Sequence, residues 1–235
     1  MTKSEDGGTL EGKMSNGSNL APYLDFANHS AQSTEAQIRE LCQKVVQYGF
    51  NAAFVNPCWV KFARQQLGNK GKVGTVVAFP LGQDTTEAKI AAALDAVHNG
   101  ADEIDVSANV GWLKEGRDDD YLGELSQIVA AVKKENPQAI IKFIIEAYFL
   151  TEAEIKQAAH LVMQSGADFV KTTSGFGPRD AKIEYVKAIK TVVGDRVRIK
   201  AAGGIKTAEE VRAYLAAGAN RIGTSKAVEI VSQGV

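Results

Sequence analysis

Lys171 stands at the end of a short apolar run, Phe169 and Val170, and hydroxyl residues and glycines follow it at once. A helix that ends at Gly166 would place this run in a buried strand with the lysine at its end. Burial disfavours the ammonium form, so the pKa of such a lysine should fall and a nucleophilic neutral amine should be populated. The segment therefore indicates a lysine that can form a Schiff base, and the alternative is a lysine that reaches from a strand end into solvent.

The same spacing from a helix-ending glycine into a strand recurs three times along the chain. The fifth residues after these glycines are Phe54 after Gly49, Asp105 after Gly100, Lys171 after Gly166 and Gly223 after Gly218. Side chains in a strand alternate with period two, so equivalent units would direct these four residues the same way and at a similar height. We expect an aromatic ring, a carboxylate, an amine and bare backbone to meet at one opening.

A second lysine, Lys200, ends the next predicted strand as Lys171 ends its own. Neighbouring strands lie about 4.8 Å apart, so the two amines could interact, and a charge kept on one would help the other to lose its proton. Asp105 ends an earlier strand, where it could transfer protons or hold a lysine charged as an ion-pair partner. Lys142 and Glu146 share one side of another strand and could join this polar core in a structural and electrostatic role.

Glycine-containing turns follow the last three predicted strands and indicate an anion site, although glycines also serve tight turns. These turns contain Gly175 and Gly177, then Gly203 and Gly204, then Gly223, and Lys226 could add charge to the last of them. The residues that we expect to bind substrate are Asp25, Thr172, Gly175, Gly203, Gly204, Gly223, Thr224, Ser225 and Lys226.

No metal-ligand spacing is present in the sequence. His29, His98 and His160 are dispersed, and two cysteines, Cys42 and Cys58, form neither a metal motif nor a disulfide framework. We therefore expect no metal.

The composition is that of one globular domain. The chain has 235 residues, 45% of them hydrophobic, and a formal net charge of −1, which gives no general reason to expect nucleic-acid or anionic-membrane binding. No apolar run approaches the roughly 18 residues of a membrane span, and no signal peptide is recognisable, so we expect a cytoplasmic protein. Residues 1–19 are polar and glycine-rich and predict a flexible tail, which leaves residues 20–235 as the folded domain.

Strand and helix patterns alternate from Leu20 onward. Capping boxes at Thr34, Thr151 and Thr207 predict helix starts, and helices separate the strand patterns. The predicted strands are residues 23–26, 52–55, 73–79, 103–107, 140–146, 169–171, 197–200 and 221–223. This alternation predicts the α/β class and a single-domain (β/α)8 TIM barrel, in which chemistry belongs to the C-terminal ends of the strands. A doubly wound sheet is the rival fold, but the Gly-x-Gly-x-x-Gly motif is absent after the first strand.

Four of these segments resemble motifs of the deoxyribose-phosphate aldolases, a family of class I, Schiff-base-forming aldolases with a (β/α)8 barrel. The segments are residues 100–105, 167–172, 199–207 and 221–225, and the resemblance runs from about Leu20 to Val231. It implies an aldehyde-lyase that reversibly cleaves 2-deoxy-D-ribose 5-phosphate into D-glyceraldehyde 3-phosphate and acetaldehyde. By the same resemblance Lys171 is the Schiff-base lysine, and Asp105 and Lys200 are the proton-transfer pair. No external cofactor is implied, the partners are small phosphosugars and aldehydes, and a homodimer is compatible with the family.

Several positions depart from the commoner family pattern around the expected pocket. They are Phe26 and Ala27 in place of His-Thr, the unusual Asn28, His29 and Ser30 that follow, Phe54 in place of a cysteine, Ala147 and Tyr148 in place of a threonine and a small residue, and Lys226 in place of a serine. Larger aromatic rings and an added cation could reshape the substrate range. One alternative is therefore a class I aldolase with the same mechanism and another phosphorylated or acidic aldol as substrate. A second alternative is a non-catalytic barrel that binds a phosphorylated metabolite.

Overall fold

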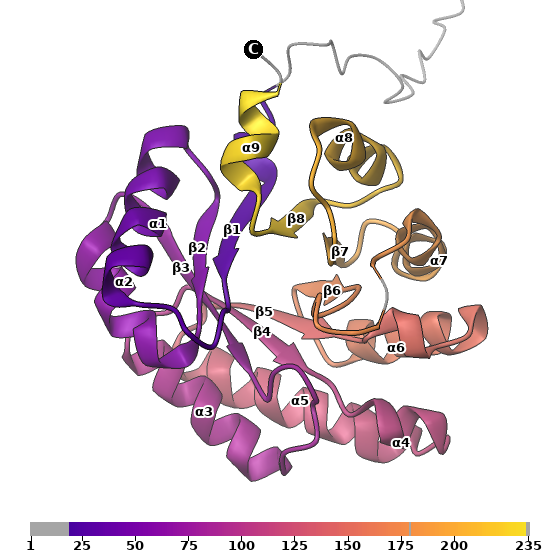
Figure 1. Ribbon diagram of the computed structural model, residues 1–235. Coiled ribbons are helices and arrows are strands. Elements are labelled where there is room, and N and C mark those ends of the chain that lie inside the picture. The colour runs from indigo at the N-terminus through magenta and orange to yellow at the C-terminus, as the bar shows by residue number, and fades with distance from the viewer. Residues whose placement is uncertain (1–18, 179, 234–235) are drawn as a thin grey trace, which may run out of the picture.

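The computed structural model describes residues 19–178 and 180–233, and within them eight parallel strands close into a barrel with β8 beside β1 (Figure 1). The strands are β1 (Leu24–Asn28), β2 (Ala52–Val55), β3 (Lys72–Val77), β4 (Glu103–Ser107), β5 (Ile140–Ile144), β6 (Phe169–Lys171), β7 (Arg198–Ala202) and β8 (Arg221–Thr224). The predicted (β/α)8 barrel is confirmed. The predicted N-terminal tail lies outside the described residues except for Asn19.

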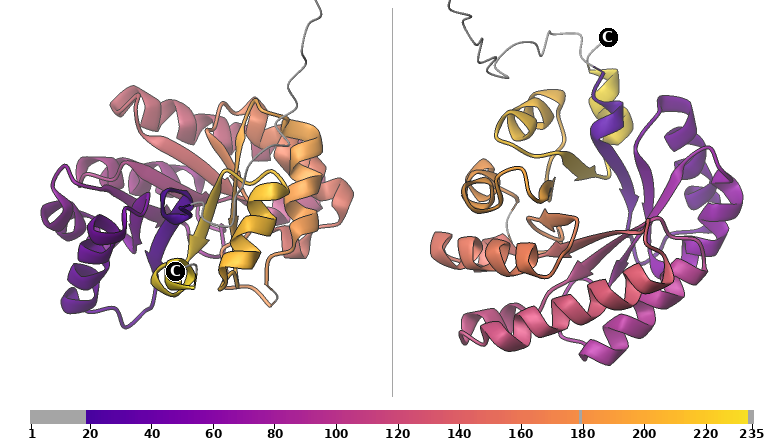
Figure 2. Two further views of the ribbon diagram at one scale, coloured as in Figure 1. Left: turned by 90° about the horizontal axis from the view of Figure 1, so that it is seen from above. Right: turned by 180° about the vertical axis from the view of Figure 1, so that it is seen from behind.

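Helices surround the strands on the outside of the barrel, as the two views in Figure 2 show. The α-helices are α1 (Glu35–Tyr48), α2 (Val60–Leu67), α3 (Thr86–His98), α4 (Val110–Lys114), α5 (Asp118–Glu135), α6 (Glu152–Gln164), α7 (Ile183–Val193), α8 (Ala208–Ala216) and α9 (Ala227–Ser232). Short 3-10 helices are η1 (Ala21–Tyr23), η2 (Pro57–Trp59) and η3 (Ala147–Phe149). Over the described residues, no helix combines the length and the apolar character needed to cross a membrane.

Three helices begin at the predicted capping boxes. Thr34, Thr151 and Thr207 are the N-caps of α1, α6 and α8, and each hydroxyl accepts a hydrogen bond from the backbone N–H three residues on. The Gln or Glu side chain at that third position bonds back to the cap residue, which satisfies donors that a helix start leaves free. Local sequence alone therefore determines where these helices begin.

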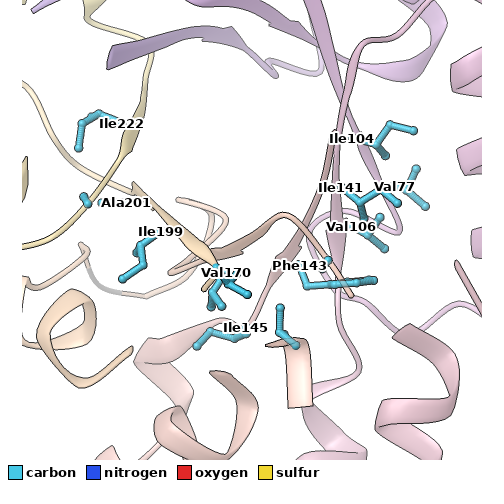
Figure 3. Close-up of a cluster of buried hydrophobic side chains, with 14 of the residues drawn as sticks. Val77, Ile104, Val106, Ile141, Phe143, Ile145, Val170, Ile199, Ala201 and Ile222 are labelled. Atoms are coloured by element: carbon cyan, nitrogen blue, oxygen red, sulfur yellow. The ribbon is translucent and has the colours of Figure 1, made fainter. Parts of the chain in front are cut away.

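The strands sort their side chains by polarity. Apolar residues point outward to the helices, and Figure 3 shows such a buried layer, including Ile104, Val106, Ile141, Phe143, Val170, Ile199, Ala201 and Ile222. The alternate positions on β4, β5 and β7 carry Glu103, Asp105, Lys142 and Lys200, all of them buried. Because side chains alternate across a strand, these charged groups project into the barrel. The interior is therefore ionic where the outer layer is apolar.

Two strands end two residues earlier than the sequence predicted. Ala78 (φ 53°) and Glu146 (φ 51°) adopt left-handed backbone conformations, so neither can extend the preceding strand. The turn at Glu146 carries its carboxylate to the backbone N–H of Ser174, 3.1 Å away. Glu146 therefore does not join the polar core inside the barrel, contrary to the expectation.

Gly74 on β3 makes room for the ring of Phe54 on the neighbouring strand. A Cβ atom at position 74 would overlap three carbons of that ring. We expect Gly74→Ala to lower the free energy of unfolding by about 1–3 kcal/mol, because the ring must move within a packed interior. Urea denaturation would measure the change. Gly123→Ala is the control, since a Cβ there meets no atom within 4 Å and should stabilise α5 by about 0.5–1 kcal/mol. Equal effects of the two substitutions would contradict the prediction.

Candidate active site

A cavity of about 670 Å³ opens at the C-terminal ends of the strands. Most of the residues predicted for the site line it, namely Lys171, Lys200, Gly175, Gly203, Gly204, Gly223, Thr224, Ser225 and Lys226. Loops after β1, β6, β7 and β8 supply most of its wall. The cavity therefore lies where a barrel of this kind places its chemistry.

Lys171 and Lys200 share one carboxylate oxygen. They are register partners on β6 and β7, and their Nζ atoms lie 2.9 and 2.8 Å from the same atom, Oδ2 of Asp105. All three side chains are buried, with Asp105 beneath the two amines and fully inaccessible. The arrangement joins a buried amine, a proton-accepting carboxylate and a second amine within hydrogen-bond distance.

The amine of Lys171 is biased toward its neutral form. Burial lowers its pKa most, the carboxylate of Asp105 opposes this, and the charge of Lys200 lowers the pKa further. The sequence predicted both burial and a neighbouring cation as causes, and the structure ranks burial first. A neutral lysine next to a carboxylate can attack a carbonyl carbon to form a Schiff base and pass protons to its neighbour.

A buried ion network supports the two amines from below. Lys142 on β5 lies 3.0 Å from Oδ1 of Asp105 and 2.6 Å from Oε2 of Glu103. Burial alone would favour neutral Lys142, but these two carboxylates raise its pKa above the ordinary value. Burial likewise acts to raise the pKa of Asp105, and the three lysines around it outweigh burial and hold it well below its usual range. Asp105 is therefore a carboxylate, and Lys142 takes the electrostatic role expected for it.

The four residues at the repeated glycine spacing do meet. The ring of Phe54 lies under the Lys200 amine, with Nζ 3.5 Å from the ring centre, in a cation–π contact. Gly223 is close as well, because a Cβ there would lie 3.0 Å from Cε of Lys200. Asp105 and Lys171 complete the group through their hydrogen bond. The period-two argument from the sequence therefore correctly predicted that these four residues come together.

Two residues expected to bind substrate do not line the cavity. Asp25 lies beneath it, with Oδ2 2.6 Å from Nζ of Lys200 and Oδ1 3.0 Å from Nη1 of Arg221. Burial raises the pKa of Asp25 and Lys200 opposes that shift. The hydroxyl of Thr172 accepts a hydrogen bond from the backbone N–H of Ala202 at 3.2 Å, which ties β6 to β7. Both residues support the site from behind rather than face the cavity.

The unusual residues divide into two groups. The first group lines the cavity, as expected, and consists of Phe26, Ala27, Asn28, His29, Ser30, Phe54 and Lys226. Ala147 and Tyr148 do not, because the turn after β5 directs the Tyr148 hydroxyl to Oγ of Ser174, 3.1 Å away. This second pair lies outside the cavity wall.

The sequence marks His29 only as part of an unusual segment, residues 28–30, and gives it no role in the site. His29 lies in the cavity wall on the loop after β1, four residues beyond Asp25. Loops have no hydrophobic period, so its departure from the family pattern and its position just beyond a strand's C-terminal end are the signals that indicate it. Across residues 19–178 and 180–233, no three His, Cys, Asp or Glu side chains are grouped so that they could hold a metal ion.

Comparison with known proteins identifies the family. Residues 19–234 match the family described as DeoC/LacD family aldolase. The chain belongs to this aldolase family. It is 43% identical over 218 residues to a deoxyribose-phosphate aldolase of Thermococcus gammatolerans, covering 92% of this chain and 96% of the relative. It is 44% identical over 213 residues to one of Aciduliprofundum boonei, covering 90% of this chain and 95% of that relative.

Solved structures agree with this family assignment. The aldolase QR15 superimposes with a TM-score of 0.86 at 37% identity, over 92% of this chain and 95% of that one. A deoxyribose-phosphate aldolase from Aeropyrum pernix, described as tetrameric, gives a TM-score of 0.83 at 28% identity over 91% and 90% of the two chains. As a DeoC/LacD aldolase, this protein is an aldehyde-lyase that performs retro-aldol cleavage of small molecules through a lysine Schiff base.

Proposed function

We propose that this aldolase reversibly cleaves 2-deoxy-D-ribose 5-phosphate into D-glyceraldehyde 3-phosphate and acetaldehyde, with Lys171 as the Schiff-base lysine. The observation that carries the proposal is the shared Oδ2 atom of Asp105, which binds the amines of Lys171 and Lys200 at the floor of an open cavity. Relatives more than 40% identical bear the name of this activity. The non-catalytic barrel has no comparable support, because it gives no reason for a buried amine of lowered pKa.

The proposed reaction follows from the two amines and the carboxylate. Neutral Lys171 attacks C1 of the open-chain sugar, and the carbinolamine loses water to give an iminium. The C3 hydroxyl then gives up its proton, the C2–C3 bond breaks, and its electrons form the enamine between C1 and C2. Protonation at C2 and hydrolysis release acetaldehyde and restore the amine. Asp105 and Lys200 exchange these protons, directly or through water.

The glycine turns and a group of lysines support binding of the phosphate. Gly203 (φ 105°) and Gly204 (φ 75°) adopt left-handed conformations that other residues rarely tolerate, so backbone can approach a ligand closely there. Lys44, Lys206 and Lys226 line the same cavity. Backbone N–H groups and lysine amines are a favourable combination for an anion, which supports a phosphorylated substrate.

Lys226 should strengthen binding of the phosphorylated substrate without changing the chemical step. Its amine lies 2.9 Å from Oε1 of Glu229, and about half of its side chain is exposed, so solvent and this carboxylate weaken its pull on phosphate. We expect Lys226→Ser to raise KM for deoxyribose 5-phosphate about fivefold and to leave kcat unchanged. Glu229→Gln should lower KM, because it frees the amine. Steady-state kinetics with deoxyribose as the unphosphorylated control would show whether the change in KM depends on phosphate. An equal change in KM for deoxyribose would contradict a role of Lys226 in phosphate binding.

The direct test of the proposed function is the retro-aldol reaction itself. Purified protein should release D-glyceraldehyde 3-phosphate and acetaldehyde from deoxyribose 5-phosphate in equal amounts. The altered residues Phe26, Ala27 and Phe54 in the cavity wall favour a second candidate, the same chemistry on another phosphorylated or acidic aldol. A panel of such aldols separates the two, since faster turnover of another member would replace deoxyribose 5-phosphate as the substrate.

We also propose that the chain forms a homo-oligomer, at least a dimer. The support is the tetrameric aldolase from Aeropyrum pernix, which shares this fold and 28% of its sequence. Light scattering of the purified protein would decide, and a monomer at all concentrations would contradict this assignment.

A further inference from the structure

The imidazole of His29 shares the cavity with Lys171, and no step of the proposed reaction uses it. Its ring centre lies 5.3 Å from the ring centre of Phe79, and Nζ of Lys171 lies 5.6 Å from that same ring centre. The imidazole and the nucleophile therefore pack against one phenyl ring. Phe176 contacts Phe79 as well, edge to face at 5.2 Å, so the aromatic support spans loops from three parts of the chain.

Hydrogen bonds hold the loop around His29 in place. The side-chain oxygen of Asn28 accepts bonds from the backbone N–H of Ser30 at 3.2 Å and from the hydroxyl of Ser33 at 2.7 Å. The Asn56 side chain donates to the carbonyl of Ser30 at 3.3 Å, which fastens this loop to the one after β2. His29 thus occupies a built position rather than a free surface loop.

One nitrogen of His29 lacks a partner. Within the part of the chain that the structure describes, Nδ1 is enclosed and makes no hydrogen bond. Leaving such a group unsatisfied is unfavourable, so a buried unpaired nitrogen in a cavity wall indicates a place for a ligand or a water. Near β1, Phe26 and Ala27 offer no side-chain polar atom to this wall, and the side-chain oxygens of Asn28 and Ser30 accept hydrogen bonds within the loop.

The charge state of His29 restricts what it can do. Burial, and then the charges of Lys171 and Lys200, lower its pKa to about 3, against smaller opposing effects of Asp105 and of the Asn56 side chain. The imidazole is therefore neutral at physiological pH and has one N–H donor and one acceptor nitrogen. A base this weak is unsuited to taking the proton of the C3 hydroxyl, but it is well suited to bind a hydroxyl that keeps its proton.

We propose that His29 is a substrate-binding residue that hydrogen-bonds the C4 hydroxyl of the bound aldol and so selects hydroxylated aldehydes. The inference rests on the proposed function, which fixes C1 at Lys171 and the phosphate at the turns after β7 and β8. The hydroxylated middle of the substrate must then face the remaining wall, to which the β1 loop contributes His29. The C4 hydroxyl lies one carbon beyond the broken bond and is not deprotonated in the reaction.

The test compares two acceptor aldehydes in the synthetic direction, with acetaldehyde as the donor. D-glyceraldehyde 3-phosphate carries the hydroxyl that becomes the one on C4, and 3-oxopropyl phosphate lacks it. We expect His29→Leu to lower kcat/KM for D-glyceraldehyde 3-phosphate about tenfold and to leave that for 3-oxopropyl phosphate within about twofold. His29→Gln, which keeps a donor and an acceptor, should retain most of the preference. His160→Leu, at an exposed position on α6, is the matched control and should change neither value.

Equal losses on both acceptors would show a purely structural role and overturn the proposal, and so would an unchanged preference in His29→Leu. The same comparison with unphosphorylated D-glyceraldehyde and 3-hydroxypropanal removes phosphate recognition from the test. If the parent protein uses only this unphosphorylated pair, the proposed substrate is wrong. The role of His29 in binding the hydroxyl is still tested, because the two aldehydes of this pair differ by the same hydroxyl. If no acceptor reacts at all, both the proposed function and the inference fail.

Discussion

Lys171→Met should reduce kcat/KM for deoxyribose 5-phosphate by about 10⁵-fold or more, because the proposed covalent intermediate forms on the Lys171 amine. Methionine preserves most of the length of the side chain and fits a buried position. Asp105 keeps contacts with Lys142 and Lys200, so the carboxylate is not left unpaired. The loss should therefore come from chemistry rather than from unfolding. A coupled assay for D-glyceraldehyde 3-phosphate measures turnover, and thermal unfolding checks the fold.

Chemical trapping locates the intermediate of this reaction directly. Parent protein treated with acetaldehyde and borohydride should gain one ethyl group on Lys171, identified by peptide mass spectrometry, and Lys171→Met should gain none at the site. Lys187→Met, at an exposed position on α7, is the control and should remain active and trappable. An adduct on a different lysine of the parent, or turnover by Lys171→Met within tenfold of the parent, would exclude Lys171 as the nucleophile.

Asp105→Asn should slow retro-aldol turnover about 10³-fold and still allow the Schiff base to form. The carboxylate contacts three lysines. An asparagine amide carries no negative charge, and only one of its two polar atoms, the oxygen, can accept hydrogen bonds from these amines. Loss of the anion from a buried network should also lower the free energy of unfolding by about 3–5 kcal/mol. Borohydride trapping that persists while turnover falls would separate proton transfer from nucleophilic attack. Loss of trapping in a folded variant would contradict this division of roles.

The charges of Asp105 and Lys200 predict opposite shifts in the pH dependence of Schiff-base formation. Asp105 raises the pKa of Lys171 and Lys200 lowers it, so Asp105→Asn should lower that pKa and Lys200→Met should raise it. A neutral amine is needed for attack. The pH at which trapping reaches half its maximal rate should therefore fall in Asp105→Asn and rise in Lys200→Met, relative to the parent. Shifts in one direction for both variants would show that these charges do not control the amine.

Local patterns predicted most of the fold because they act over a few residues. The capping boxes at Thr34, Thr151 and Thr207 fixed helix starts, and the glycine spacing located Lys171 and Asp105. The failures lie where backbone leaves the regular conformation. Glu146 shares the strand parity of Lys142, but its left-handed φ turns it away from the barrel, and alternation alone does not contain that turn.

The partners within the site could be predicted only in part. Asp105 lies 66 positions from Lys171 and 95 from Lys200, so their contacts depend on the closure and register of the whole barrel. Asp25 was expected to bind substrate and instead pairs with Lys200 from beneath, because both side chains point into a closed interior. His29 belongs to a loop without a periodic pattern, so the sequence indicated an unusual segment near the pocket but gave the imidazole no role.

The ionic interior described above links electroneutrality to the proposed catalytic cycle. Its buried carboxylates are Asp25, Glu103 and Asp105, and the cationic side chains enclosed with them are Lys142, Lys171, Lys200 and Arg221. Lys72, which also lies against Glu103, is about half exposed to solvent and is not counted here. With the carboxylates ionised, this set balances only when one amine is uncharged. Condensation with the aldehyde returns a positive charge to Lys171 as an iminium, and bond cleavage discharges it as a neutral enamine. A medium of low dielectric constant favours conversion of the cationic iminium to the neutral enamine. The barrel interior itself would therefore promote cleavage of the carbon–carbon bond.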